Sequence, residues 1–432
     1  MKVLFIGVGL VHYFNPILNR LNAGDNIQVL NLVPSSSRGH LEPGVFTTQE
    51  GVDFKVIFLK ERRMTPLFKG FARLHKLLQS ERPDIIVYTD YYANIFLFDL
   101  LTTWTVRRLG IKLIMKSIPF RLKKYRDALA DPENLPNLNF YLPKALRERI
   151  HHRGLHKLLR QVKVYLQRMA FNRPHAHVNY TPEAVDIFGS YGVSKNRIFI
   201  TYNSPDTDIL LGIRRKIENE PPLMPVNEHR IIHVGRLVEW KRVDLLIHSL
   251  HLIKSTFPSA ELIVVGDGPM RSDLVSLANR LGLMDSVIFK GAVHDAEILG
   301  KLFSCSSVFV LAGMGGLAIN DAMCFGKPII CSVCDGTERM LVRNAVNGLL
   351  FRNGDLKDLT SKILFLFNHP DKRREMGMAS TRIIRNEINV HTVIRGYMDA
   401  FNFVMNQKQR CSADSKRKVC CDTIPTSHGS IH

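Results

Sequence analysis

Two segments in the second half of the chain hold the residues best suited to chemistry. In residues 233–250, Gly235 follows a short apolar run, and Arg236 and Lys241 come next, five positions apart. Two cations at the carboxyl end of a parallel strand can clamp a diphosphate, because ligands of open α/β sheets bind at that edge. Two solvated loop residues are the alternative interpretation of the same pair.

The second segment, residues 313–350, begins with a glycine-rich turn at 313–316 and runs into a helix-like stretch that carries Asp321. Exposed N–H groups at a helix start attract phosphate oxygens, and an acid about one turn further can accept hydrogen bonds from a ribose diol. The turn also fits a plain strand-to-helix connection, and Asp321 fits an acid that only favours the helix dipole. The upstream cations favour the nucleotide-binding interpretation.

Alternating strand and helix patterns must position these residues. In the first 200 residues, strand-like runs are predicted at 3–6, 28–32, 55–59, 84–88, 112–115 and 177–180. Apolar residues at helical spacing predict a helix over 67–80. A second alternation runs from Arg230 to about Asn368, and 371–406 is predicted to be helical. This order is typical of parallel sheets with helices on both faces.

The length of 432 residues exceeds a usual single core and predicts two domains. Residues 1–205 are expected to form a first, acceptor-binding domain. Clustered prolines mark 206–229 as the linker, and residues 230–385 form the second domain. We expect 386–407 to be a helix that returns to the first domain, and 408–432 to be a disordered polar tail.

Four ordered motifs carry a family resemblance over roughly residues 230–380: Arg236–Lys241, Gly266-Asp-Gly-Pro269, Phe289-Lys-Gly291 and the 313–350 block. Together they resemble retaining glycosyltransferases of the GT-B fold, specifically family 4. The resemblance implies two Rossmann-like, doubly wound parallel-sheet domains facing a central cleft. It also implies a nucleotide-sugar donor whose diphosphate is held by Arg236 and Lys241, and Asp321 as the acid on the ribose.

The resemblance assigns further donor-binding positions around these motifs. Backbone near Phe289, Gly291 and Val293 would lie beside the base. The remaining expected donor-binding positions are Gly235, Gly266, Gly268, Gly313, Gly316, Leu317 and Ala318, together with Gly7 and Gly9 of the first domain. One departure concerns Gly313, where the family pattern has a glutamate that usually contacts the donor sugar. Sugar recognition is therefore expected to differ here, and impaired activity is the alternative.

Candidate groups in the first domain lie at the carboxyl ends of its predicted strands. Gly7 and Gly9 suit the turn after the first strand, and His12 follows that turn. Asp90 follows the run at 84–88 and is the candidate catalytic group, while Lys116 ends the run at 112–115. His12 and Lys116 are assigned to the acceptor side. Ordinary polar loop residues are an equally good interpretation of these positions.

The formal net charge of +20 predicts anionic partners. Nine cations face one acid in residues 144–173, beside an apolar stripe at helical spacing. This helix either packs on its own domain or binds an anionic membrane surface through Lys157, Arg160 and Lys163. The basic stretches hold few aromatic residues and no zinc or RNA-binding signature, which disfavours nucleic acid.

Other sequence features narrow the remaining classes of protein. Cys331 and Cys334 have metal or redox spacing, but no second pair flanks them, so buried thiols are expected. Neither a metal nor another cofactor is expected. The apolar N-terminus resembles a first strand more than a signal peptide, and no apolar run is long enough to cross a bilayer. We therefore expect a cytoplasmic protein that can associate with the inner face of the plasma membrane.

The expected function is retaining transfer of a sugar from a nucleotide-sugar to an acceptor hydroxyl. Cell-surface polysaccharide synthesis (capsule or lipopolysaccharide) or lipid-linked glycan assembly is the expected setting. A nucleotide-sugar epimerase of the same fold is one alternative, although the Arg236, Lys241 and Asp321 pattern argues against it. A catalytically inactive binding protein is the other alternative, and Gly313 motivates it.

Overall fold

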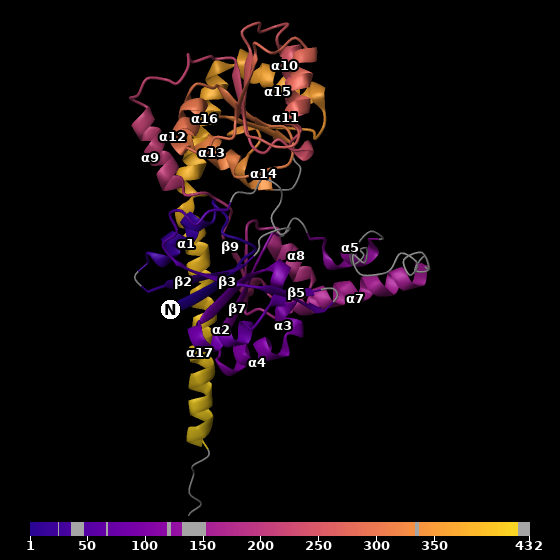
Figure 1. The fold of residues 1–432 in the computed structure, drawn as a ribbon, viewed down its shortest axis with the longest axis vertical. Coiled ribbons are helices and arrows are strands. Elements are labelled where there is room, and N and C mark those ends of the chain that lie inside the picture. The colour runs from indigo at the N-terminus through magenta and orange to yellow at the C-terminus, as the bar shows by residue number, and fades with distance from the viewer. Residues whose placement is uncertain are drawn as a thin grey trace, which may run out of the picture.

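Two parallel sheets, each covered by helices on both faces, make up the chain. The computed structural model describes residues 1–24, 26–35, 47–65, 68–118, 122–131, 153–332 and 337–421. Figure 1 shows the N-terminal sheet below the C-terminal one, with the yellow helix α17 (Val390–Cys421) running down from the upper part along the lower one. The expected α/β class with two doubly wound parallel sheets is confirmed.

The N-terminal sheet has the strand order β3-β2-β1-β6-β7-β8-β9, and every neighbouring pair is parallel. Its strands are β1 (Lys2–Ile6), β2 (Gln28–Pro34), β3 (Lys55–Leu59), β6 (Ile85–Thr89), β7 (Lys112–Ser117), β8 (Ala176–Asn179) and β9 (Ile198–Ile200). The six strands predicted from apolar runs are therefore present, within a residue or two at each end. β9 was not predicted, because a three-residue strand leaves almost no pattern.

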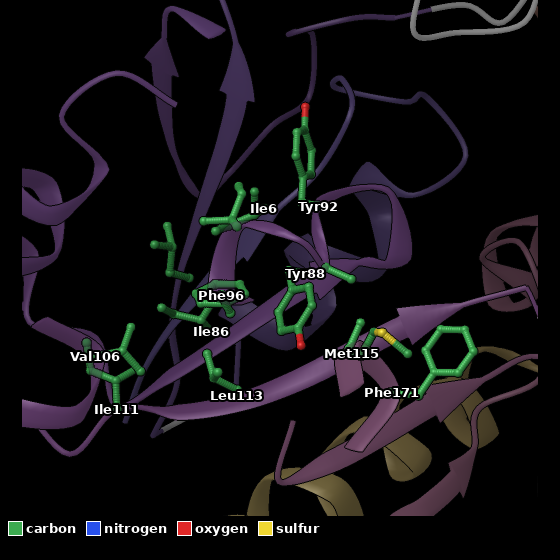
Figure 2. Packing of buried hydrophobic residues seen from close by; sticks show 14 of the residues in the cluster. Ile6, Ile86, Tyr88, Tyr92, Phe96, Val106, Ile111, Leu113, Met115 and Phe171 are labelled. Carbon is green, nitrogen blue, oxygen red and sulfur yellow. The ribbon is translucent and has the colours of Figure 1, made fainter. Parts of the chain in front are cut away.

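Alternate residues of these strands enter two separate cores, because successive side chains leave a strand on opposite faces. Leu4, Ile86 and Tyr88 lie on one face, whereas Val3 and Val87 lie on the other. Figure 2 shows the first face, where Tyr88 packs beside Phe96 with ring centroids 4.5 Å apart. Burial on both faces explains why these strands are continuous apolar runs.

The N-terminal helices connect these strands. They are α1 (Asn15–Asn22), α2 (Leu74–Glu81), the short η1 (Asp90–Tyr92), α3 (Ile95–Phe98), α4 (Leu100–Arg108), α5 (Tyr125–Ala130), α7 (Arg153–Asn172), α8 (Ala184–Ser190) and η4 (Lys195–Arg197). The prediction of one helix over 67–80 is wrong at its start. Residues Phe68–Phe71 form β5, which pairs with β4 (Glu61–Thr65) in an antiparallel hairpin. The left-handed backbone of Arg73 (φ 59°) separates this hairpin from α2.

The C-terminal sheet has the order β12-β11-β10-β13-β14-β15 and is also parallel throughout. Its strands are β10 (Arg230–Val234), β11 (Glu261–Val265), β12 (Val287–Gly291), β13 (Val308–Leu311), β14 (Ile329–Ser332) and β15 (Gly348–Phe351). The helices that cover it are η5 (Glu239–Lys241), α10 (Val243–Ile253), α11 (Arg271–Arg280), α12 (Ala296–Ser304), α13 (Ala318–Cys324), α14 (Thr337–Leu341), α15 (Leu356–Asn368) and α16 (Pro370–Asn386).

The expected linker at 206–229 begins with a helix instead. Helix α9 (Thr207–Ile217) starts at Asp206, whose side chain accepts from the backbone N–H of Ile209. Leu210 and Ile217 enter the core of the C-terminal sheet, so α9 belongs to that domain. The segment without regular structure is confined to 218–229 and contains the proline cluster. The capped helix before the prolines was not predicted.

The chain returns from the C-terminal domain to the N-terminal one between α16 and α17, because Ile388 packs in the C-terminal core and Val390, the first residue of α17, packs in the N-terminal core. Further along α17, the buried residues Tyr397, Ala400, Phe401 and Val404 pack in the same core as Val3 and other residues of β1. The expectation of disorder from residue 408 is wrong for the first part of the tail, because α17 continues to Cys421. Residues 422–432 lie outside the described part of the chain.

The described residues contain no helix that is long and apolar enough to cross a membrane. They also contain no group of three or more histidine, cysteine or acidic side chains placed to hold a metal ion. Cys331 is buried, as its apolar strand predicted, and Cys305 and Cys324 are buried free thiols. Cys334 lies outside the described residues.

Candidate functional site

The switch point of the C-terminal sheet brings together the two segments that carry the candidate donor-binding residues, 233–250 and 313–350. Strands β10 and β13 are neighbours, and ligands of open α/β sheets bind where the strand order reverses. The chain leaves β10 through Gly235 and Arg236, and it leaves β13 into the 313–316 turn. Arg236 is half-buried, and its guanidinium lies 5.9 Å from the centre of the Trp240 ring.

Lys241 connects the two loops directly. Its side chain is almost fully buried, with 8% of the residue exposed. The Nζ atom donates to the carbonyl oxygens of Met314 at 2.8 Å and Gly315 at 2.6 Å. These two contacts hold the Lys241 ammonium at the glycine-rich turn, close to the start of α13, where an anionic ligand would meet it.

Close backbone packing accounts for the two glycines of the motif at 266–269. A Cβ atom on Gly266 would lie 1.9 Å from the carbonyl oxygen of Gly235, and one on Gly268 would lie 2.4 Å from that of Leu237. Gly266 also has a φ of 139°, which side chains rarely adopt. These two glycines therefore allow the loop after β11 to support the loop that carries Arg236.

Gly313 is explained by the same kind of contact. Its Cβ would lie 2.1 Å from the carbonyl oxygen of Trp240, which also accepts a hydrogen bond from the N–H of Met314 at 3.0 Å. No side chain fits at 313 unless one of these two loops moves. The departure from the family glutamate is thus built into the packing of the turn against η5.

Asp321 lies one turn into α13 and is half-buried. Removal of the carboxyl from water raises its pKa to about 7. The N–H groups of Leu317 and Ala318, at the start of this helix, have no partners within it. The Asp321 carboxyl and these two N–H groups therefore lie on one short segment.

The base-side candidates lie on β12 and just after it. Phe289 packs on the core of the α10 face, whereas Val293 packs on the core of the α13 face. The carbonyl oxygen of Gly291 accepts from the N–H of Gly266 at 2.7 Å. This bond ties the β12 end to the loop that supports Arg236.

His233 and Asn320 are polar residues of this region that the sequence did not identify. The buried His233 ring contacts the Val310 carbonyl oxygen through Nδ1 at 3.1 Å, so Nδ1 carries the proton and Nε2 is an acceptor. Burial, with a smaller effect of Lys241, lowers its pKa to about 4. Buried Asn320 donates to the carbonyl oxygen of Asn203, which joins α13 to the domain crossing. A polar residue inside an apolar strand or helix was the available signal.

A second site lies at the switch point of the N-terminal sheet, between β1 and β6. A cavity of about 170 Å³ is lined there by Gly7, Gly9, Asp90 and Lys116, with the aromatic residues Tyr13, Phe14 and Tyr180. The structure thus brings together four of the predicted residues. His12 is exposed and is not part of the lining; its ring packs edge-on against Tyr13. Gly7 and Gly9 belong to this site and not to the loops around Lys241.

Lys116 contributes a basic side chain to the lining of this cavity. Its ammonium lies 3.2 Å from the centre of the Phe14 ring and 5.6 Å from that of Tyr180. Desolvation lowers its pKa to about 7, and no carboxylate of the described residues forms an ion pair with it. The cavity therefore offers aromatic walls and an ammonium group. A bound anion or a hydroxyl oxygen that accepts a hydrogen bond would stabilise this ammonium.

Helix α7 carries the predicted membrane residues, but they face different surroundings. Lys157 is exposed, whereas Arg160 donates to the carbonyl oxygen of Asp131 at 3.2 Å. Burial lowers the pKa of Lys163, although Asp131 opposes this effect. In the predicted apolar stripe, Leu158, Val162 and Met169 are exposed, whereas Leu159 and Leu166 are half-buried. The side chains that α7 places in the core, Val164 and Phe171, lie outside that stripe, and Tyr165 is exposed beside it.

Comparison with known proteins agrees with this geometry. Residues 214–382 match the family model described as glycosyl transferases group 1. An uncharacterized glycosyltransferase of Haemophilus influenzae is 26% identical over 203 residues, which cover 46% of this chain and 54% of that protein. The lipopolysaccharide core biosynthesis glycosyltransferase LpsD of Rhizobium meliloti is 27% identical over 183 residues, covering 41% and 50%. The chain thus spans about half the length of these curated relatives.

A solved structure covers nearly the whole chain. The crystal structure of Anabaena HepE in complex with UDP aligns with a TM-score of 0.62 at 18% identity, over 93% of this chain and all of that one. This likeness establishes the arrangement of both domains. The chain therefore has the GT-B fold, and it resembles glycosyltransferases of group 1 and family 4, with residues 214–382 matching the group 1 domain.

Proposed function

We propose that this chain is a glycosyltransferase that moves a sugar from a nucleotide-sugar to an acceptor hydroxyl with retention. The observation that carries the proposal is the meeting of Lys241 with the 313–316 turn, next to Arg236 and the α13 segment that holds Asp321. Positive charge held in place beside a leaving diphosphate stabilises the negative charge that develops as the sugar departs. Asp321 would accept from the ribose hydroxyls.

The donor is proposed to be a uridine diphosphate sugar. The support comes from the HepE structure, which was solved in complex with UDP and has the same fold. Backbone near Gly291 and Val293 would lie beside the base. No metal is proposed, because Arg236 and Lys241 supply the charge that would otherwise have to come from a cation.

The acceptor is proposed to bind in the N-terminal cavity, between Asp90 and Lys116. Asp90 would stand closest to the reacting hydroxyl because it lies at the carboxyl end of β6, the edge on which ligands of this type of sheet bind. Aromatic walls suit the apolar faces of a sugar ring. The relative LpsD supports a setting in cell-surface glycan synthesis, and the exposed α7 stripe supports attachment to the inner face of the plasma membrane.

A panel of nucleotide sugars tests this proposal. Thermal stabilisation would identify the donor, and release of nucleoside diphosphate with and without candidate acceptors would measure turnover. We expect one uridine diphosphate sugar to stabilise the protein and to be consumed. Stabilisation without turnover would indicate a catalytically inactive binding protein, which is the alternative that Gly313 motivates. Stabilisation by no nucleotide sugar would refute the donor site.

A further inference from the structure

A cavity that the proposed reaction does not use lies at the opposite edge of the N-terminal sheet. It measures about 350 Å³ and is lined by Arg107, Lys112, Arg173 and His175, with apolar residues between them. Lys112 begins β7, and His175 immediately precedes β8. These are the amino ends of the strands, whereas Asp90 and Lys116 lie at the carboxyl ends.

The polar side chains that line this cavity are nitrogen donors. The described lining residues include no carboxylate. In the described part of the chain, no carbonyl or carboxylate accepts a hydrogen bond from the side chains of Arg107, Lys112 or Arg173. Asp84, which precedes the neighbouring strand, accepts from the N–H of Lys2 at 2.9 Å and does not line the cavity.

His175 adds a donor whose tautomer is determined by the backbone. The N–H of Leu113 donates to Nδ1 at 3.0 Å, so the neutral ring carries its proton on Nε2. Burial, together with the charges of Lys112, Arg197 and Arg173, lowers the pKa of this ring to about 4. Burial and the charge of Arg107 also lower the pKa of Arg173. The group of cations is therefore under mutual repulsion, which a bound anion would relieve.

We propose that this cavity binds a phosphate group. Two guanidinium groups, one ammonium and one imidazole N–H match the several acceptor oxygens of phosphate. Arg107 lies on α4 and Arg173 immediately follows α7, and both helices carry exposed apolar side chains in the turns before these arginines. On α4 these are Leu100, Leu101 and Trp104, and on α7 they are Tyr165 and Met169. Exposed apolar side chains beside the cations suit an anionic lipid, whose headgroup would supply the phosphate. A free phosphate ion is the other possible source of the bound group.

Titration followed at His175 tests the site in the full-length protein. Histidines would be labelled with ¹³C at Cε1 in a deuterated background, and UDP would saturate the other phosphate-binding site. The His175 signal is assigned with His175→Gln. We expect inorganic phosphate to shift this signal and leave that of buried His177 unchanged. Arg173→Gln should weaken binding at least tenfold, whereas Arg108→Gln should change it less than twofold. Arg108 is a matched control because it stacks over Trp104 and does not line the cavity.

The same titration with monomeric dihexanoylphosphatidylglycerol distinguishes the two sources. Binding at least tenfold tighter than that of inorganic phosphate, and reduced by Trp104→Ser, would identify a lipid phosphate. Equal affinity for both, unaffected by Trp104→Ser, would identify a free phosphate. An unchanged His175 signal with both ligands, or a shift that Arg173→Gln does not weaken, would overturn the site. Either result leaves UDP binding and turnover unaffected, so it does not bear on the proposed transfer reaction.

Discussion

At the scale of single residues, Lys241 combines burial with charge. Its contacts with two neutral carbonyl oxygens hold the ammonium at the glycine-rich turn. We predict that Lys241→Ala or Arg236→Ala lowers turnover at least about 100-fold, as loss of a preorganised charge contact does. Steady-state kinetics with the identified donor would measure the loss.

The next residue provides the control for this prediction. The Arg242 guanidinium pairs with Asp244 at 3.1 Å, and Arg242→Gln should leave turnover within about threefold because it removes a charge that is paired elsewhere. Wild-type kinetics in a folded Lys241→Ala protein would contradict the assignment of the donor site.

Asp321 couples nucleotide binding to pH. In the free protein its pKa is about 7. Ribose hydroxyls that donate to the carboxylate favour the ionised form, so binding lowers this pKa and releases a proton. We therefore predict that the affinity for UDP is constant well above pH 7 and falls as the pH drops below it. Calorimetry near pH 7 in buffers of different ionisation enthalpy would detect the released proton.

Asp321→Asn tests the same carboxylate without a change of size. This substitution should weaken UDP binding by roughly 1.5–3 kcal/mol, the scale of hydrogen bonds to a charged group. It should also abolish the proton release. Equal affinities for the two proteins at pH 8 would place Asp321 outside the site.

Gly313 is predicted to tolerate no side chain. In Gly313→Ala the new Cβ would meet the carbonyl oxygen of Trp240, so η5 and the turn must separate. We expect a loss of about 1–3 kcal/mol in stability, typical of overpacking, together with at least tenfold weaker UDP binding because Lys241 moves with η5. Gly212→Ala is the matched control, since its Cβ would meet nothing within 4 Å. Wild-type affinity in Gly313→Ala would show that the two loops separate freely.

At the scale of elements, α7 presents its exposed stripe beside basic residues. We predict that the protein sediments with anionic vesicles but not with neutral ones, and that the effect fades at high salt, because exposed charges are screened over about 8 Å at physiological ionic strength. Charge reversal of Lys157 should weaken sedimentation more than reversal of Arg160 or Lys163, which lie toward Asp131.

The apolar contribution of α7 can be tested separately. Val162→Asp should reduce sedimentation at all salt concentrations, because it removes apolar surface from the exposed stripe. Met378→Asp, on the exposed face of α16, is the control and should have no effect. Sedimentation with neutral vesicles to the same extent would rule out the electrostatic mechanism.

At the scale of the whole molecule, α17, the last described helix of the chain, packs on the N-terminal domain after the C-terminal domain is complete. Its residue Phe401 is fully buried against the N-terminal sheet. We predict that Phe401→Ala destabilises the N-terminal domain by about 3–5 kcal/mol through the cavity it leaves. Hydrogen exchange should accelerate in β1 and β8 and remain unchanged in β10. The exposed Asp399→Ala should alter neither, and equal acceleration in both sheets would indicate a single cooperative unit.

The sequence by itself determined the elements that depend on local pattern. Strands buried on both faces are continuous apolar runs, so six strands of the N-terminal sheet were predicted from residue types alone. The hairpin of β4 and β5 was missed because the charged run at 61–63 does not resemble a strand, and the helix start was misplaced because the left-handed Arg73 leaves no periodic signal. The four ordered motifs also sufficed to predict the GT-B fold.

Only the tertiary structure decided how residues far apart in the chain meet. Lys241 reaches carbonyl groups more than seventy positions away because β10 and β13 are neighbours in the sheet. The packing of the Trp240 carbonyl against the same turn explains Gly313, which appeared to be a lost glutamate in the sequence. The pKa values of Asp321 and Lys116 depend on burial, which no local pattern encodes. The cation cavity at the amino edge likewise exists only because the ends of α4 and α7 are brought together at β7 and β8.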